Sequence, residues 1–529
     1  MELSRIIDQL SQPSAYPGPV DAVEVRQTHI SAVFLAGDHV YKIKKPVSLG
    51  FLDFRTLDAR RHFCQEEVRL NRRLAPRVYL GVVPIVGGDD GVRIDQPGEP
   101  VEWAVKMQRL DDNATLEAYL ERDEPIEAAV ETLAVRLAEF HAAAERGSHI
   151  AEFGSFAVVE RNALENFEQA APHVGTVISP TVFERLRELT VAELANRRGL
   201  IEARALRSVP CDTHGDLRLG HVYWMPELTP PDDLVVIDCI EFNERFRYAD
   251  PVGDIAFMAM GLSRSGRHDL ERLFVDAYFR ASGDLEGREL LPLYVAYRAA
   301  VRGKVDAMQA ARAEIPAAQR DMARSKSRGY WLAALGALEA PDRRPCLLLV
   351  GGLPGTGKST LAAELAARSG FELIRSDLVR KELADKLVTS DASATFEQGI
   401  YTPEWTERTY AECLRRAEKH LFDGRRVVVD ASFRQDAPRR QFLEAADHWG
   451  VPTMLWVCQA ETEVVRQRIA ARRGDVSDAD WSIHQQAASR WEPAGPRAER
   501  ALTTIDTTAG QESTWPQAQA ALRENNLAT

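Results

Sequence analysis

The sequence lacks the features that mark secreted, membrane-bound or zinc-containing proteins. Its six cysteines are scattered without a Cys-x-x-Cys pair, so neither a zinc site nor a disulfide framework is indicated. No apolar run approaches the roughly 20 residues of a membrane-spanning helix. The start of the chain is polar and amphipathic and contains no signal-peptide core. We therefore expect a cytoplasmic protein with no membrane partner.

The chain also lacks a net positive charge, because 79 acidic residues outnumber 66 lysines and arginines. The formal net charge is −13 at pH 7, which argues against a general nucleic-acid-binding protein. A local basic groove would survive this average, so RNA is disfavoured as a partner but not excluded. The chain is long: it has 529 residues, of which 45% are hydrophobic, and this is more than one hydrophobic core accommodates. This length predicts about two to four globular domains.

The strongest motif is a glycine-rich stretch that follows a buried strand. Leu347–Val350 is a continuous apolar run, and apolar residues recur at helical spacing from Lys358 onward. Between them the sequence fits the G-x-x-x-x-G-K-[ST] pattern in the strand–loop–helix context that a phosphate site requires. Glycines let backbone amides surround a phosphate, the lysine can reach the β- and γ-phosphates, and the serine can bind Mg²⁺. We predict a nucleoside triphosphate site at Gly352, Leu353, Pro354, Gly355, Thr356, Gly357, Lys358, Ser359 and Thr360.

Two aspartates follow apolar segments farther along the chain. Residues 371–377 are typical of a strand that ends in Asp377, and residues 425–430 of a strand that ends in Asp430. Carboxylates at the carboxyl ends of parallel strands face the crevice where ligands bind. Both aspartates are therefore expected near the triphosphate.

This half of the chain resembles the P-loop small-molecule and polynucleotide kinases, such as gluconate kinase, polynucleotide kinase and zeta-toxin-like enzymes. The resemblance implies that Asp377 is the general base for an acceptor hydroxyl and that Asp430 orders Mg²⁺ through water. It also implies that Arg380, at D-x-x-R spacing, contacts the substrate. Arginines one helical turn apart would neutralise the transferring phosphate, and these are Arg468 and Arg472.

The N-terminal half carries a second constellation. It contains Asp212-Thr213-His214-Gly215-Asp216, then the apolar segment 234–242 with Asp238, and then Gly253-Asp254-Ile255-Ala256. With these residues it resembles the aminoglycoside phosphotransferase family, the small-molecule branch of the kinase-like fold. The resemblance implies that Asp216 orients or deprotonates the acceptor hydroxyl and that Asp238 binds Mg²⁺. His214 and Asp254 would brace the catalytic loop.

Upstream of these motifs lies a predicted β-hairpin followed by a helix. Residues 30–45 alternate around a Gly37-Asp38 turn, which places Lys42 and Lys44 on the same face, and residues 55–75 are typical of a helix that carries Glu67. Kinase-like folds pair a strand lysine with a helix glutamate. By resemblance, Lys42 would contact the nucleotide phosphates and Glu67 would position it.

One residue departs from the phosphotransferase pattern. His221 stands where the family has the asparagine that binds a second metal ion. An imidazole can bind Mg²⁺, although this hard cation prefers oxygen ligands. Three interpretations stay open: one metal ion is held more loosely, Glu241 or Asp238 compensates, or this lobe binds its ligand without turnover.

The two resemblances predict a chain with α/β and α+β domains, in which a bilobal kinase-like fold precedes a P-loop NTPase with a doubly wound parallel sheet. The order resembles the family of bifunctional aminoglycoside phosphotransferase/ATP-binding proteins. The expected divisions are a helical leader at 1–28, a kinase-like domain at 29–339, a linker at 340–345 and a P-loop domain at 346–529.

The implied activity is transfer of phosphate from ATP, with Mg²⁺, to a hydroxyl of a small molecule such as a sugar, an aminocyclitol or a nucleoside. Two alternatives remain. In one, the P-loop domain phosphorylates RNA or polynucleotide ends. In the other, the N-terminal lobe is a ligand-sensing pseudokinase that gates a P-loop ATPase.

Overall fold

The chain folds as two compact units in a computed structural model that describes residues 2–50, 52–88, 91–385, 402–471 and 480–529. Each unit gathers segments from distant parts of the sequence. Unit 1 comprises Met1–Glu160, Arg197–Leu262 and Arg267–Tyr294, and unit 2 comprises Arg161–Asn196, Ser263–Gly266 and Val295–Thr529.

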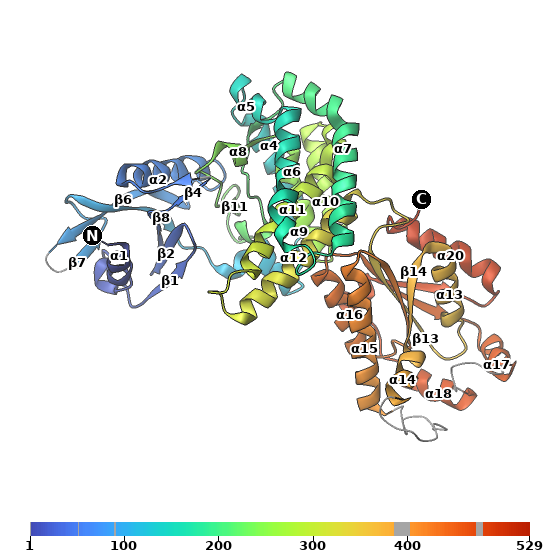
Figure 1. Cartoon of the computed structure of the whole chain (residues 1–529). Helices are drawn as coiled ribbons and strands as arrows, with labels where there is room; N and C mark the ends of the chain where they lie inside the picture. Colours follow the sequence, from blue (N-terminus) through green and yellow to red (C-terminus); the bar gives the residue numbers. More distant parts are fainter. Residues whose placement is uncertain (1, 51, 89–90, 386–401, 472–479) are drawn as a thin grey trace. The chain divides into compact units, whose positions relative to one another are not determined.

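Unit 1 begins with a six-stranded antiparallel sheet (Figure 1). In spatial order its strands are β1 (Val23–Gln27), β2 (Ser31–Ala36), β3 (His39–Lys44), β8 (Pro100–Gln108), β6 (Tyr79–Gly88) and β7 (Gly91–Ile94). The predicted hairpin is confirmed, because Ala36 pairs with His39 across a Gly37-Asp38 turn. Gly37 has φ +58°, which a two-residue hairpin turn favours.

The two faces of this sheet are covered by different helices. Tyr41 and Ile43 point to one face and pack with α1 (Leu3–Leu10), so the expected leader segment 1–28 contributes both α1 and the edge strand β1. The other face packs against α2 (Leu57–Asn71), through Cys64 and Val68. Lys42 and Lys44 therefore point toward α2.

The rest of unit 1 is mainly helical, with short strands that carry the predicted catalytic motifs. The hairpin of β10 (Val222–Trp224) and β11 (Leu234–Val236) and the pair of β9 (Cys211–Asp212) and β12 (Tyr248–Ala249) hold these motifs in place. Further elements are α3 (Leu116–Glu121), α4 (Glu127–Ala143), α5 (Ser148–Phe153), η4 (Leu219–His221), α8 (Glu244–Arg247), α9 (Val252–Arg264) and α10 (His268–Ser282).

Unit 2 contains a five-stranded parallel sheet whose order is β14, β15, β13, β16, β17. Helices α13 and α20 cover one face, and α15 and α16 cover the other (Figure 1). The three strands predicted in this half are confirmed as β13 (Cys346–Gly352), β14 (Phe371–Arg375) and β15 (Arg426–Asp430), and β16 (Thr453–Gln459) and β17 (Leu502–Asp506) complete the sheet. The helices are α13 (Lys358–Ser369), α14 (Ser376–Asp385), α15 (Pro403–Phe422), α16 (Asp436–His448), α17 (Thr462–Ala471), α18 (Trp481–Ser489), α19 (Pro496–Arg500) and α20 (Gln511–Glu524).

Helices that precede the linker also belong to unit 2. Part of α6 (Phe156–Ala170), part of α7 (Pro180–Leu206), most of α11 (Leu291–Ala310) and all of α12 (Ala317–Leu338) lie in it. Trp331 of α12 is 1% exposed and packs on Phe167 and Phe183. On its other side α12 contacts α16, where a Cβ at Gly329 would lie 2.4 Å from the carbonyl oxygen of His448. The helix therefore joins the α6–α7 layer to the parallel sheet.

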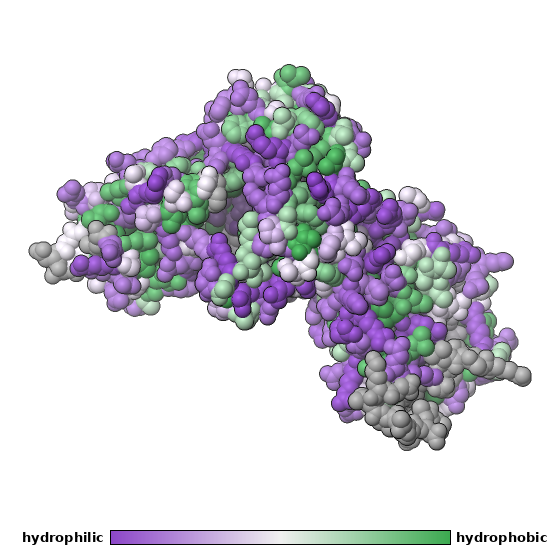
Figure 2. All heavy atoms as spheres, in the orientation of Figure 1, coloured by the Kyte–Doolittle hydropathy of each residue, from purple (hydrophilic) through white to green (hydrophobic). Residues whose placement is uncertain are grey.

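Polar residues cover most of the surface that faces the viewer in Figure 2. Among the helices that the structure describes, none combines the length and apolar character needed to cross a membrane.

Candidate functional site

The predicted strand-to-helix ion pair forms in unit 1. Nζ of Lys42, on β3, lies 2.8 Å from Oε1 of Glu67, on α2. Glu67 is 1% exposed, and its second oxygen, Oε2, accepts a hydrogen bond of 2.8 Å from Lys44. Lys44 is equally buried and also donates to Glu241. Sequence analysis missed this second pair, although Lys44 stands two residues from Lys42 on the same face of the strand. Glu241, one candidate to compensate at the metal site, is thus engaged by Lys44.

Electrostatics keep this group of residues charged. Burial opposes ionisation of Glu67, but Lys42 and Lys44 outweigh it and lower the pKa of this carboxyl. Burial likewise opposes the charge on Lys42, and the surrounding carboxylates Asp238, Glu67 and Glu241 raise its pKa well above the usual value. The lysine is therefore cationic at neutral pH and suited to a phosphate ligand.

The loop that carries Asp216 is braced by His214 and Asp254, the two residues that the resemblance assigned to this role. The carboxylate of Asp254, in the first turn of α9, accepts hydrogen bonds from the amides of His214 (2.6 Å) and Gly215 (2.9 Å). His214 accepts from the amide of Asp216 at Nδ1 and donates to the carbonyl of Ile237 from Nε2, so it is neutral. Burial lowers the pKa of His214 to about 4. The loop thus presents Asp216 with a fixed backbone.

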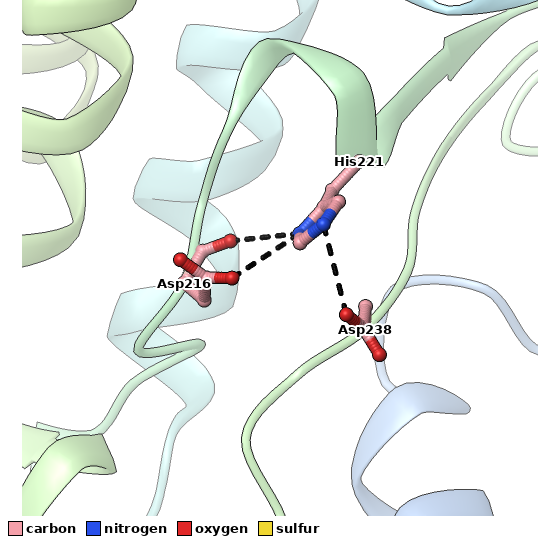
Figure 3. Close-up of side chains that lie close together, drawn as sticks. All are labelled: Asp216, His221 and Asp238. Atoms are coloured by element: carbon pink, nitrogen blue, oxygen red, sulfur yellow. Dashed lines mark hydrogen bonds and ion pairs between the residues drawn. The ribbon is translucent and has the colours of Figure 1, made fainter. Parts of the chain in front are cut away.

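Three predicted residues of the loop region converge on one point (Figure 3). One ligand atom from each of Asp216, His221 and Asp238 lies within 4.8 Å of the others. Asp238 has φ +63°, and its turn is held by hydrogen bonds from the Asp238 amide to the hydroxyl of Tyr79 and from the Cys239 amide to Oδ1 of Asn71. The nearby Lys42 ammonium holds the pKa of Asp238 well below its usual range. Two carboxylates and an imidazole fit a divalent cation.

A residue that sequence analysis missed lies within this cluster. Nη2 of Arg218 is 3.0 Å from Oδ2 of Asp216 and 2.5 Å from Nε2 of His221. Its Nε is buried and has no hydrogen-bond partner. The available signal was its position two residues after Asp216, which by itself does not indicate where the side chain points.

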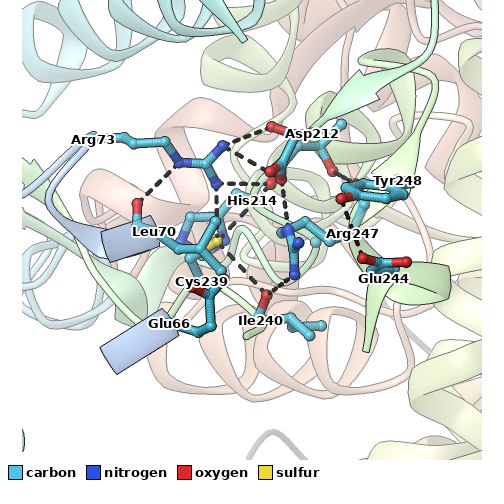
Figure 4. Close-up of polar contacts among 12 residues, drawn as sticks. Glu66, Leu70, Arg73, Asp212, His214, Cys239, Ile240, Glu244, Arg247 and Tyr248 are labelled. Carbon is cyan, nitrogen blue, oxygen red and sulfur yellow. Dashed lines mark hydrogen bonds and ion pairs between the residues drawn. The ribbon is translucent and has the colours of Figure 1, made fainter. Parts of the chain in front are cut away.

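A second unpredicted cluster lies behind the loop (Figure 4). Arg73, which follows α2, donates to the carbonyl oxygens of Asp212 (2.9 Å) and Thr213 (3.2 Å) and to the sulfur of Cys239. Arg247 donates to the buried carboxylate of Asp212 at 2.5 Å. These contacts hold α2 against the loop that carries Asp216 and against the segment that carries Asp238.

In unit 2 the glycine-rich loop has the backbone that a phosphate site needs. Gly352, Gly355 and Gly357 all have positive φ (+142°, +86° and +84°). A Cβ at Gly355 would lie 2.9 Å from the side chains of Ile469 and Val465, so the chain passes too closely for any other residue. Helix α13 begins at Lys358, and the amides of its first turn have no acceptor within the helix. These amides can bind an anion.

The two predicted aspartates differ in their surroundings. Asp430 ends β15 between β13 and β14, is 4% exposed, and has an Oδ1 atom without a hydrogen-bond partner. Burial raises the pKa of Asp430, against the influence of Lys358 and Ser359. Asp377 is half-buried and does not end a strand as expected, because β14 stops at Arg375 and α14 begins at Ser376. The helix starts early because Ser376 and Asp377 favour a first helical turn.

The predicted arginines occupy different settings. Arg380 is 8% exposed and donates to Oγ1 of Thr406. Arg468 donates to the carbonyl oxygen of Thr507 at 2.6 Å, and Thr507 in turn donates to the carbonyl oxygen of Thr356 in the glycine-rich loop. Arg468 therefore secures a loop that touches the phosphate site. Arg472 lies outside the described residues.

Comparisons with known proteins agree with the C-terminal motif and extend over the chain. A family model described as an AAA domain matches residues 347–494. The uncharacterized proteins Rv2004c of Mycobacterium tuberculosis and Mb2027c of Mycobacterium bovis are each 33% identical over 484 residues, covering 90% of this chain and 93% of theirs.

Solved structures give weaker similarities. A gluconokinase from Sinorhizobium meliloti 1021 is 18% identical, with a TM-score of 0.26, over 34% of this chain and 93% of that one. A choline/ethanolamine kinase family protein from Mesorhizobium loti is 12% identical, with a TM-score of 0.36, over 63% and 98%.

Proposed function

This chain belongs to the family of the mycobacterial proteins Rv2004c and Mb2027c, and from that premise we propose that it is a phosphotransferase with two nucleotide sites. Each site uses ATP and Mg²⁺ and transfers the γ-phosphate to a hydroxyl of a small molecule. The observation that supports the first site best is that Lys42 contacts both Glu67 and Asp238, which lie on separate elements of unit 1.

In the first site the residues divide the work between binding and proton transfer. Lys42, positioned by Glu67, binds nucleotide phosphates, and Asp238 and His221 hold Mg²⁺. The acceptor oxygen attacks the γ-phosphorus as the bond to the bridging oxygen of ADP breaks, and Asp216 takes the hydroxyl proton. When bound, Mg²⁺ neutralises phosphate charge.

In the second site the glycine-rich loop and Lys358 bind the β- and γ-phosphates. Ser359 and Asp430 hold Mg²⁺, and the partnerless Oδ1 of buried Asp430 fits this role. Asp377 takes the acceptor proton, Arg380 contacts the substrate, and Arg468 and Arg472 neutralise charge on the transferring group.

The test follows label from γ-labelled ATP into a metabolite and RNA extract. Wild type is run beside Asp216→Asn and Lys358→Ala, with the exposed charges Asp276→Asn on α10 and Arg368→Ala on α13 as controls. We expect each site variant to lose a different labelled product and the controls to lose none. If neither variant loses a product, the proposal is wrong.

His221 and Arg218 support one second candidate, in which the first site senses a ligand without turnover. In that case only Lys358→Ala loses label. His221→Asn would then create or raise activity at the first site, whereas an adapted catalytic site would lose activity with this change.

A further inference from the structure

His221 is fixed in a single tautomer. Its Nδ1 lies 2.9 Å from the backbone carbonyl oxygen of Asp216, and because a carbonyl only accepts hydrogen bonds, Nδ1 carries the proton. The backbone on both sides is also held, since the His221 amide donates to Arg218 and the His221 carbonyl accepts from Ile237. The lone pair of the ring is therefore on Nε2, as in a histidine prepared to bind a metal ion.

Each of the two carboxylates has an oxygen atom close to the imidazole ring. Lys42 binds Oδ1 of Asp238, which leaves Oδ2 at 3.6 Å from Nε2 of His221. Oδ2 of Asp216 lies on the other side of the ring, 3.8 Å from Nδ1 (Figure 3). The resulting donor set is one nitrogen and two oxygens.

Arg218 contacts two of the atoms that would bind the metal ion. Its Nη2 contacts both Nε2 of His221 and Oδ2 of Asp216. A lone pair that accepts a hydrogen bond from a guanidinium cannot at the same time bind a metal ion, so the two cations exclude one another. The buried Nε of Arg218 has no hydrogen-bond partner. This atom therefore does not hold the side chain in place once the contacts of Nη2 are lost.

We propose that Arg218 and a divalent cation compete for His221 and Asp216, and that the imidazole makes this site favour a first-row transition-metal ion over Mg²⁺. The inference deepens the proposed function, because it concerns the metal of the same first site. Mg²⁺ prefers a complete set of oxygen ligands and dehydrates reluctantly, whereas imidazole nitrogen is a good ligand for transition-metal dications. The second site, with Ser359 and Asp430, has oxygen donors and suits Mg²⁺.

The test measures binding of Mn²⁺ alone to the full chain, without nucleotide, by electron paramagnetic resonance of the free ion. All proteins carry Asp430→Asn to weaken the second site. Arg218→Gln, which removes the competing charge, should tighten Mn²⁺ binding about tenfold. Arg218→Lys keeps a charge, and Arg122→Gln removes an exposed one that pairs with Glu124; both should bind as the parent does.

Selectivity is tested in the same assay by displacing Mn²⁺ with Mg²⁺. His221→Asn should weaken Mn²⁺ binding roughly tenfold and leave Mg²⁺ binding no weaker, so the Mn²⁺/Mg²⁺ preference falls. Equal preference in parent and His221→Asn would overturn the selectivity. Unchanged or weaker Mn²⁺ binding in Arg218→Gln, with unfolding like that of the parent, would overturn the competition.

These outcomes are separable from those of the proposed function. Metal binding is read without ATP, so the inference can hold when no phosphate is transferred at the first site. Conversely, Asp216-dependent labelling with no effect of Arg218→Gln on Mn²⁺ binding would leave the proposed function standing and remove the inference.

Discussion

Gly215 is the residue on which the position of Asp216, the proposed catalytic aspartate, depends most directly. It has φ +86°, and a Cβ there would lie 2.8 Å from the carbonyl oxygen of Phe246. Both the left-handed backbone and the lack of space therefore require glycine, and the neighbouring Asp216 inherits its orientation from this turn.

Gly215→Ala should lower the free energy of unfolding by about 2–4 kcal/mol and reduce transfer at the first site. Gly18→Ala is the matched control in the same unit, because Gly18 has φ +92° but nothing within 4 Å of its Cβ position. Gly18→Ala should cost only about 1 kcal/mol, for backbone strain alone. Chemical denaturation measures both, and equal losses would show that the contact with Phe246 is unimportant.

His214 makes the stability of unit 1 depend on pH. Its pKa is about 4 in the folded chain, against an ordinary 6.5. Between these values only the unfolded chain binds the proton, so the stabilisation is complete above pH 6.5 and is lost as pH falls toward 4.

The stability advantage of wild type over His214→Gln should shrink by up to about 3 kcal/mol between pH 6.5 and pH 4. Denaturation curves at a series of pH values measure this difference, and the exposed His62 on α2 is the control position. A difference that stays constant with pH would show that His214 is not held neutral by burial.

At the scale of elements, α2 contacts the segments of the proposed first site at several points. Glu67 reaches Lys42 and Lys44, Asn71 holds the amide of Cys239, and Arg73 holds the carbonyls of Asp212 and Thr213. A shift of α2 would break these buried contacts together. The helix is therefore a fixed part of the site.

Arg73→Ala should destabilise unit 1 by about 2 kcal/mol and lower the rate at the first site, because it removes the guanidinium hydrogen bonds to the carbonyl oxygens of Asp212 and Thr213. Arg73→Lys should recover only part of this, since lysine lacks the forked guanidinium. Arg69→Ala, which breaks an exposed pair with Glu66, should change stability by less than about 0.5 kcal/mol. If Arg73→Ala changes stability and rate as little as Arg69→Ala does, the contacts of Arg73 with the Asp212 and Thr213 carbonyls do not stabilise the site.

For the whole molecule, unit 2 extends beyond the P-loop sheet. Helix α12 precedes the linker yet packs on α16, and Arg426 of β15 binds backbone carbonyls of the linker residue Asp342 and of Leu527. The stability of the P-loop sheet should therefore depend on residues before position 340.

Two glycines of α12 test this dependence. Gly329→Ala would place a Cβ 2.4 Å from the His448 carbonyl oxygen and should lower the stability of unit 2 by about 1–3 kcal/mol. Gly336→Ala meets only an Arg344 side-chain carbon at 3.8 Å and should raise stability by about 0.5–1 kcal/mol through helix propensity. Denaturation curves that monitor the parallel sheet of unit 2 measure the stability of both variants. A stability change of the same sign in both would contradict a close α12–α16 contact.

The sequence by itself determined the elements and the local chemistry. Residue patterns predicted the hairpin of β2 and β3 and the strands β13, β14 and β15, and the glycine pattern predicted the loop before Lys358, because these features depend on residues that are neighbours in the chain. The pairing of Lys42 with Glu67 was implied by the resemblance to kinase-like folds, and the structure contains this contact.

Only the tertiary structure decided which charges meet. Lys44 with Glu241, Arg218 with His221, and Arg73 with Asp212 are contacts that chain spacing does not indicate. The membership of α12 in unit 2 is of the same kind. Such contacts depend on how whole elements pack, and a sequence pattern records the buried face of each element without recording the neighbour that will cover it.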